Sequence, residues 1–303
     1  MVSVIIPTFG NPIFLEKAIR SVTSQTIDDW ELIVVDDNNA ETEARMLTEE
    51  VMSIFSDNRI KYIKHPHNKN GAAARNTALR VAKGEYICFL DSDDEYMPNR
   101  LEECVRVMKL AGGDFAGVYT GCEFRRRGKT YLRYKNVKSG KFIVETLACR
   151  FMFCTGSNIF VRRAVIDELN GFDEAFLRHQ DYEFLVRLFE KYSLIALPDI
   201  LVIKNNENVN MPDVVKMESV KKRYLEKFNR IINKLTKEEQ SYIFYANYIS
   251  LAELSISQKD FAQGRHFYSL ARQNKSLTFI DNMRRLGFYL RAYLTSGSRT
   301  PDK

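Results

Sequence analysis

The chain has no long apolar run and no clustered cysteines. No stretch approaches the roughly 18 apolar residues of a transmembrane helix, and the N-terminus lacks a signal-peptide pattern. The five cysteines are odd in number and form no C-x-x-C pair, which argues against a structural zinc site and predicts reduced thiols. We therefore expect a cytoplasmic globular protein without a membrane span. The cysteines are Cys88, Cys104, Cys122, Cys149 and Cys154.

Glycine-rich phosphate loops are missing as well. The first predicted strand, residues 2–6, is not followed by G-x-G-x-x-G, and the chain contains no Walker loop. These absences exclude the usual dinucleotide fingerprint and the P-loop. Phosphate groups would instead have to be held by a metal ion and by basic side chains such as Arg75.

Length and composition allow a large core, and the charge is unevenly distributed. The 303 residues are 45% hydrophobic and 28% charged, which predicts a globular protein with one large and one smaller domain. Residues 204–303 hold 18 Lys and Arg against 10 Asp and Glu, whereas residues 1–203 hold 27 against 29. This asymmetry indicates two regions with different partners.

The strongest local signal is an apolar run that ends in acids. Residues 87–90 are typical of a strand buried on both faces, and four carboxylates lie within the next five residues. Asp91 and Asp93 are two apart, so on an extended backbone they face the same way and suit Mg²⁺ or Mn²⁺. The alternative is a solvated acidic turn. A calcium loop is excluded because Tyr96 stands where that loop requires Gly.

Strands and helices alternate through the first hundred residues. This alternation predicts βαβ crossovers, a parallel sheet, and one sheet edge that carries Thr8, Asp36, Asp37, Asp91 and Asp93. The predicted strands are residues 2–6, 31–35, 60–63 and 87–90, and the predicted helices are residues 12–25, 41–55 and 72–81.

Four ordered motifs in this region resemble those of family 2 glycosyltransferases. They are residues 2–9, 31–37, 70–76 and 84–94. The resemblance implies an α/β fold of the GT-A type, a Rossmann-like and mostly parallel sheet flanked by helices, followed by a C-terminal all-helical domain. It also implies an inverting, nucleotide-sugar-dependent enzyme of the bacterial surface-polysaccharide type.

The resemblance assigns roles to individual residues. Asp37 would accept a hydrogen bond from uracil N3–H, Asp91 would lie by the ribose or metal, and Asp93 would coordinate Mn²⁺ or Mg²⁺. Alternatives remain a helix N-cap for Asp37 and a solvent-facing charge for Arg75. The nucleotide-binding set is Pro7, Thr8, Phe9, Asp37, Asn70, Gly71, Arg75, Asp91 and Ser92.

Asp181 is the candidate general base. The family usually places Glu-Asp at this helix start, and here the pair is Gln180-Asp181, so the base is retained and the role of the Glu is open. An ordinary N-terminal helix charge is the alternative for Asp181. Many relatives also carry a late His at the metal or phosphate site. This chain has none there, which leaves Lys204 or an Asn to make that contact.

Between these motifs the pattern is less regular. It predicts a strand at 114–120 and a hairpin with a basic tip at 123–130, which is either a solvated turn or a contact for an anionic acceptor. Residues 153–160 resemble the family segment that contacts the transferred sugar, with Gly156 allowing close backbone approach. Residues 171–174 resemble a turn that precedes the base, and residues 194–203 predict a last strand.

The predicted domains are residues 1–205 and residues 206–303. Four helices are expected in the second domain, and residues 252–272 resemble a tetratricopeptide-type hairpin with its turn at 258–260. Arg284, Arg285 and Arg291 alternate with apolar and aromatic residues, which suits a membrane surface, a homodimer contact or a helix that packs on the core with a solvated face. The helices are residues 213–234, 237–257, 259–273 and 278–294.

The resemblance implies a metal-dependent glycosyltransferase that moves a hexose or N-acetylhexosamine from a UDP-sugar to a growing surface glycan, which is expected to be carried on a lipid. We expect no nucleic-acid partner, and a location in the cytoplasm or on the inner face of the plasma membrane. One alternative is a non-catalytic subunit of glycan assembly whose helices recruit partners. Another is a sugar nucleotidyltransferase, which would need a phosphate loop that this chain lacks.

Overall fold

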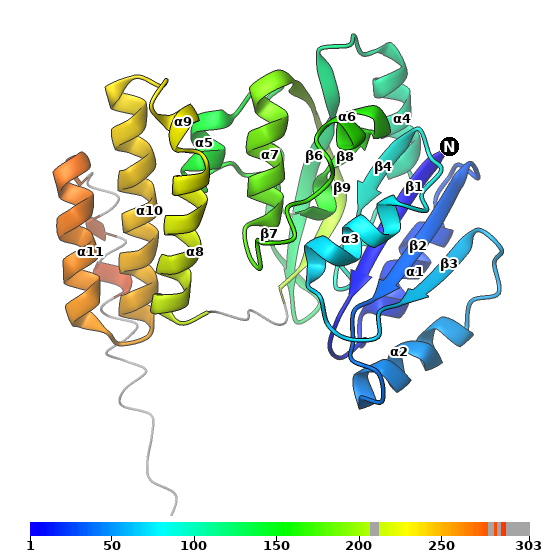
Figure 1. Ribbon diagram of the computed structural model, residues 1–303. Coiled ribbons are helices and arrows are strands. Elements are labelled where there is room, and N and C mark those ends of the chain that lie inside the picture. Colours follow the sequence, from blue (N-terminus) through cyan, green and yellow to red (C-terminus); the bar gives the residue numbers. More distant parts are fainter. Residues whose placement is uncertain (155, 207–211, 278–281, 284–285, 289–303) are drawn as a thin grey trace, which may run out of the picture. The chain divides into compact units, whose positions relative to one another are not determined.

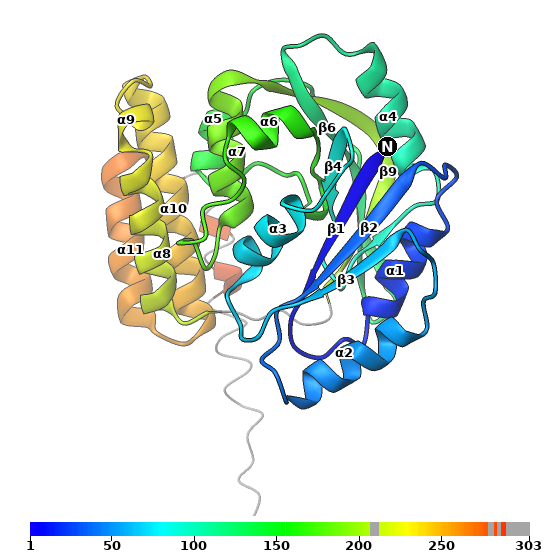
Figure 2. The ribbon, with the colours of Figure 1, turned by 45° about the vertical axis from the view of Figure 1, so that its right-hand side comes forward.

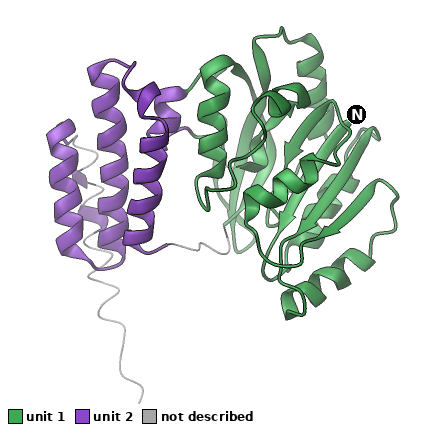
Figure 3. Cartoon of the chain, viewed as in Figure 1, with its two compact units in different colours: residues 1–142, 152–209 green, residues 143–151, 210–303 purple. Residues whose placement is uncertain are grey.

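The computed structural model describes residues 1–154, 156–206, 212–277, 282–283 and 286–288. The chain divides into two compact units (Figure 3). The first contains residues 1–142 and 152–209, and the second contains residues 143–151 and 210–303. A short segment from the middle of the sequence therefore packs with the C-terminal helices.

A nine-stranded sheet forms the centre of the first unit within the described residues (Figure 1). The predicted parallel pairing is confirmed for β1 to β4, whereas β8 runs antiparallel to β4 and β6, so the whole sheet is mixed. In sheet order the strands are β3 (Ile60–Lys64), β2 (Trp30–Asp36), β1 (Val2–Thr8), β4 (Tyr86–Phe89), β8 (Phe160–Arg162), β6 (Phe115–Arg126), β9 (Ser193–Asn205) and β5 (Glu95–Tyr96), and β7 (Lys129–Tyr134) pairs with β6.

Helices cover both faces of this sheet. Val4 and Leu32 face one core together with Leu15 and Ile19 of α1, while α3 lies on the opposite side of β1 and β2 (Figure 2). Successive side chains of a strand point to opposite faces of the sheet, and all residues of β2 are buried, so both faces of this strand are covered. The helices are α1 (Leu15–Thr23), α2 (Glu43–Ser53), α3 (Gly71–Leu79), α4 (Arg100–Leu110), α6 (Arg163–Glu168) and α7 (Gln180–Lys191).

The start of the first helix differs from the sequence prediction, and the hairpin agrees with it. Pro12 was expected inside the first turn of α1, but its carbonyl accepts from Leu15 N (2.9 Å) in a turn that precedes the helix. The expected hairpin is present, with Arg127 and Gly128 at positive φ in its turn. The charge of its tip is partly neutralised, because Arg125 pairs with buried Glu123 at 2.7 Å.

The second unit is a small helical assembly. Helix α10 is buried on several sides because it packs against both α8 and α11. Thr236 and Glu239 form a capping box at its start, and residues 258–260 form the expected turn before α11. Gly264 lets the two helices approach closely, since a Cβ there would lie 2.7 Å from Ile256. The helices are α5 (Ile143–Leu147), α8 (Val214–Lys227), α9 (Asn229–Ile232), α10 (Lys237–Ser257) and α11 (Phe261–Asn274).

The described helices contain none with the length and apolar content that a bilayer crossing requires. The arginines of the predicted helix at 278–294 lie outside the described residues. The five cysteines are free, and four of them are buried.

Candidate active site

A pocket of about 660 Å³ opens at the carboxyl edge of the parallel strands. The ends of β1, β2 and β4, the start of α3 and the end of β9 bring its lining residues together. Every residue predicted to bind nucleotide or metal lines this pocket. These residues are Pro7, Thr8, Phe9, Asp37, Asn70, Gly71, Arg75, Asp91, Ser92 and Asp93. Sequence reasoning missed Asn11, Phe14, Asn68, Ala74 and Leu177, which also line it.

The Asp37 carboxylate organises the loop between β3 and α3. Its Oδ1 accepts from His65 Nδ1 (2.7 Å) and Lys69 N (2.9 Å), and its Oδ2 accepts from Asn68 Nδ2 (2.8 Å) and Asn70 N (2.9 Å). A carboxylate offers about four acceptor positions, so these donors fill them. Contact with a uracil N3–H therefore requires one of the four donors to yield. The alternative of a helix cap is wrong, because Asp37 caps no described helix.

Asn70 and Gly71 shape the start of α3. Asn70 is the N-cap, with φ of 110° and an Oδ1 that accepts from Ala72 N (2.9 Å) and Ala73 N (3.1 Å). Gly71 lies under the side chains of Arg75 and Gln180, where a Cβ would come within 3.1 Å of both. A larger residue at position 71 would thus require the side chains of Arg75 and Gln180 to shift slightly.

Arg75 joins two parts of the site. Its guanidinium donates to Gln180 Oε1 (2.9 Å) and to Asp91 Oδ1 (2.8 Å), and its side chain is 13% exposed. The alternative of a solvent-facing helix charge is therefore wrong. Gln180 replaces the usual Glu of the family as a neutral acceptor for this arginine, which leaves the cationic charge of Arg75 less neutralised than a Glu would.

Three carboxylates form a compact acidic cluster beside Arg75. Oxygens of Asp91, Asp93 and Asp94 lie within 4.8 Å of one another. Asp94 is fully buried and accepts from Ser157 Oγ (2.6 Å) and Asn205 N (3.1 Å), so its oxygens are turned toward the protein. Burial raises the pKa of Asp94 well above its ordinary value. Asp91 and Asp93 are partly exposed, at 26% and 38%, and are the oxygen donors available to a ligand.

Lys204 lies among these three carboxylates. Its Nζ is 3.2 Å from Asp94, 3.6 Å from Asp93 and 3.8 Å from Asp91. Burial alone would lower the pKa of Lys204, but the three negative charges raise it. The ammonium thus offsets part of the repulsion that would otherwise force these carboxyl groups to take up protons.

Asp181 lies at the first turn of α7 and does not line the pocket. Its Oδ1 accepts from Tyr182 N (2.9 Å), and its neighbour Gln180 is bonded to Arg75. Burial raises the pKa of Asp181, partly opposed by the charge of Arg75. A half-buried carboxyl group with a raised pKa is a stronger base than an exposed one.

Two further predicted segments reach the same region. A Cβ on Gly156 would lie 3.6 Å from Arg75 and 4.0 Å from Asp91, so this backbone approaches the site closely. Ser157 accepts from Asp91 N (2.9 Å) as well as donating to Asp94. The turn at 171–174 is fastened to α3, because Asn76 Nδ2 donates to Phe172 O (2.9 Å).

The sequence profile described as "Glycosyl transferase family 2" matches residues 3–169 of this chain. The chain belongs to glycosyltransferase family 2. It is therefore a glycosyltransferase, and the non-catalytic and nucleotidyltransferase alternatives are set aside.

Two named relatives resemble this glycosyltransferase over about two thirds of its length. It is 29% identical over 199 residues to the UDP-Glc:alpha-D-GlcNAc-diphosphoundecaprenol beta-1,3-glucosyltransferase WfgD of Escherichia coli, covering 65% of this chain and 73% of that protein. It is 30% identical over 205 residues to the amylovoran biosynthesis glycosyltransferase AmsB of Erwinia amylovora, and the match covers 65% of this chain and 67% of that protein.

Solved structures share its fold at low sequence identity. TarS of S. aureus in complex with UDP-GlcNAc is 17% identical, with a TM-score of 0.56 over 91% of this chain and 93% of that one. The mannosyltransferase PcManGT of Pyrobaculum calidifontis, in complex with GDP-Man and Mn²⁺, is 17% identical. Its TM-score is 0.58, and the match covers 98% of this chain and 87% of that one. The expected GT-A fold with a helical C-terminal region is confirmed.

Proposed function

We propose that this glycosyltransferase moves a hexose or N-acetylhexosamine from a UDP-sugar to a growing surface glycan on a lipid carrier, with inversion at the anomeric carbon. The observation that carries the proposal is the pocket that joins Arg75, Lys204 and the acidic cluster at the carboxyl edge of the sheet. The name of WfgD, which specifies UDP-glucose and a diphosphoundecaprenol acceptor, supports both the donor and the acceptor class.

The residues present fit a divalent cation. Asp91 and Asp93 offer hard oxygen donors that are partly exposed, which suits Mg²⁺ or Mn²⁺ together with substrate phosphates. Asp93, whose side chain is more exposed than that of Asp91, is the proposed direct ligand. When bound, the cation would neutralise charge on the leaving diphosphate.

The chain's own cations and rings would hold the donor. Arg75 and Lys204 are placed to bind the diphosphate, since both already contact the carboxylates around it. Phe9, whose side chain is 63% exposed at the pocket, would lie against the nucleotide base. Asp37 would take the uracil N3–H in place of Asn68, because the Asn68 amide can rotate whereas the two backbone donors cannot.

Asp181 would act as the base. Inverting transfer needs a group that removes the proton from the acceptor hydroxyl on the side opposite the leaving diphosphate. The acceptor would approach from this side, and the exposed cations of the hairpin tip, Arg126, Arg127 and Lys129, would contact it if it is anionic. We further propose residues 1–205 as the catalytic domain, and residues 206–303 as a helical domain that touches acceptor, membrane surface or a second copy. This enzyme would then work in the cytoplasm, at the inner face of the plasma membrane.

A nucleotide-sugar screen tests the proposal. Purified full-length protein is incubated with UDP-, GDP- and dTDP-sugars, with Mn²⁺ or with chelator, and released nucleotide is measured. We expect release from one UDP-sugar that chelator abolishes and that Asp93→Asn abolishes in a folded protein. Full activity in chelator would overturn the metal dependence, and release from GDP- or dTDP-sugars only would overturn the donor class.

A further inference from the structure

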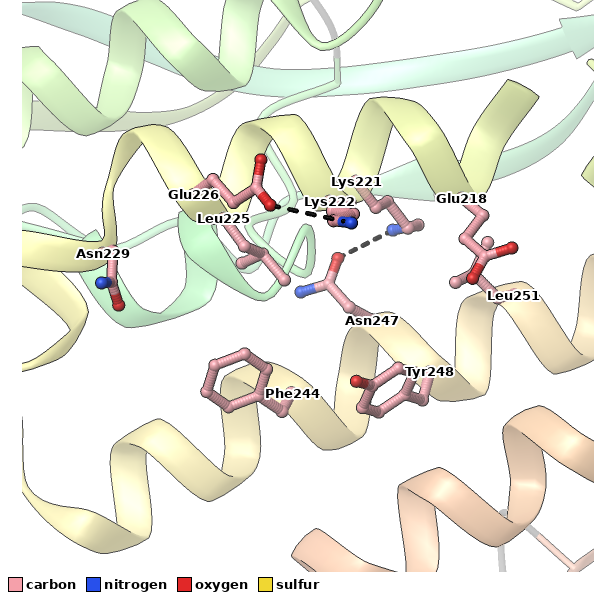
Figure 4. Close-up of a pocket in the computed structure, with 10 residues that line it drawn as sticks. All are labelled: Glu218, Lys221, Lys222, Leu225, Glu226, Asn229, Phe244, Asn247, Tyr248 and Leu251. Atoms are coloured by element: carbon pink, nitrogen blue, oxygen red, sulfur yellow. Dashed lines mark hydrogen bonds and ion pairs between the residues drawn. The ribbon is translucent and has the colours of Figure 1, made fainter. Parts of the chain in front are cut away.

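The helical unit contains a second groove of about 550 Å³ between α8 and α10 (Figure 4). None of its lining residues lines the candidate active site. Buried Lys221 and Asn247 form its floor, and half-buried Leu225, Phe244 and Tyr248 form its walls. Its exposed rim carries both signs of charge. The rim residues are Glu218, Lys222, Glu226 and Asn229.

The floor of the groove holds a lysine in a fixed position. Lys221 is 3% exposed, and its Nζ donates to Asn247 Oδ1 at 2.9 Å. Asn247 cannot turn its oxygen away, because its Nδ2 donates to Leu147 O (3.0 Å) and Ile243 O (2.9 Å). Figure 4 shows the two side chains directed toward each other between the helices.

This buried ammonium forms no ion pair with the residues that the structure describes. The ion pairs there do not include Lys221, and rim residue Glu226 lies 4.0 Å from Lys222 instead. A buried cation held by one neutral acceptor is costly, and burial lowers the pKa of Lys221 accordingly. The cost falls if a ligand brings an anionic group to the floor of the groove.

We propose that the groove binds a single-chain lipid anion, with its one carboxylate or phosphate on Lys221 and its chain along Leu225, Phe244 and Tyr248. The volume falls within the usual range of small-ligand pockets, roughly 300–1,000 Å³. The walls are apolar and the single buried charge is positive, so the groove matches one acidic head and one apolar chain. The site does not depend on the proposed donor or acceptor.

The test measures binding of laurate and of 1-dodecanol, below their aggregation concentrations, to the full-length protein by calorimetry. The two probes share a chain and differ in charge. We expect wild type to prefer laurate by at least about tenfold, the value of one hydrogen bond to a charged group. Lys221→Met should abolish this preference while retaining dodecanol binding. Lys222→Met, on the exposed rim of the same helix, should keep it.

Further arms separate the proposal from a purely structural lysine. Lys221→Arg, which keeps the charge, should keep the preference, and if Lys221→Met does not fold, the displacement experiment on the wild type still tests the proposal. Dodecyl phosphate should displace laurate, whereas inorganic phosphate and UDP should not. The proposal is overturned if laurate shows no saturable binding, if Lys221→Met and Lys222→Met behave alike, or if inorganic phosphate competes as well as dodecyl phosphate.

Discussion

At the scale of single residues, the site depends on charges placed by contacts between distant segments. Arg75 is held by Gln180 and Asp91, and Lys204 by three carboxylates. Each cation is kept at a position where a diphosphate could replace some of its present partners.

Asp181→Asn should bind UDP and Mn²⁺ like wild type and lose sugar transfer by about 10²–10⁴-fold. The amide keeps size and hydrogen bonding but cannot take the proton from the acceptor. Calorimetry and transfer assays on the same preparation measure the two effects. Turnover at the wild-type rate in this variant would show that Asp181 is not the general base. Glu183 is a poor alternative for the base because it is buried and paired with Arg187 at 2.6 Å.

The pH profile gives a second measure of the same residue. Burial raises the pKa of Asp181, and a base acts only when ionised, so transfer should fall on acidification at a pH higher than an exposed Asp would give. This acidic limb should move or disappear in Asp181→Glu if Asp181 produces it. An identical limb in that variant would assign the titration to another group.

Lys204→Met should bind Mn²⁺ more tightly than wild type when no nucleotide is present. Its ammonium lies 3.2–3.8 Å from the three carboxylates, so it competes with a cation for them, and removing it should tighten Mn²⁺ binding by at least about tenfold. UDP binding should weaken because one phosphate contact is lost. Lys109→Met, on an exposed face of α4, is the control. Unchanged Mn²⁺ affinity would contradict the competition.

At the scale of elements, the loop between β3 and α3 is built on one side chain. Asp37→Asn replaces two acceptor positions by donors that face Asn70 N or Lys69 N, so the loop should lose about 1–3 kcal/mol of stability without nucleotide. Denaturant unfolding measures this loss, and Asp167→Asn, at an exposed position of α6, is the control.

Nucleotide binding gives a second measure of Asp37. In the wild type, UDP should raise the melting temperature more than CDP does, and the Asp37→Asn variant should lose that difference. A variant as stable as wild type would contradict the network.

At the scale of the whole molecule, the chain combines a near-neutral unit and a basic one. Residues 204–303 carry most of the net positive charge, and they include both the end of β9 and the helices of the second unit. The sheet edge of the first unit supplies the candidate active site, and α8 and α10 supply a groove of different chemistry. Sugar transfer and the proposed lipid binding should therefore be separable by variants, because the residues of the two sites lie in different units.

The sequence alone determined the elements and the edge of the sheet that carries the site. Apolar runs that end abruptly in acids predicted β2 and β4, because burying those carboxylates within the core would be too costly, and an apolar run closed by Pro7 and Thr8 predicted β1. The predicted turn at 258–260 likewise separated the two helices that correspond to α10 and α11, and their predicted bounds agree with the structure to within two residues. These signals are local, so they can be read without knowledge of the fold.

Only the tertiary structure decided how these residues are used. Lys204 meets Asp94 across 110 positions, and Gln180 meets Arg75 across 105, contacts that depend on the order of strands in the sheet. The four donors around Asp37 and the lone charge of Lys221 were likewise invisible in the sequence, because neither burial nor a partner can be read from one residue type. Strand order and helix packing fix such long-range contacts, and with them the charge that each group presents to a ligand.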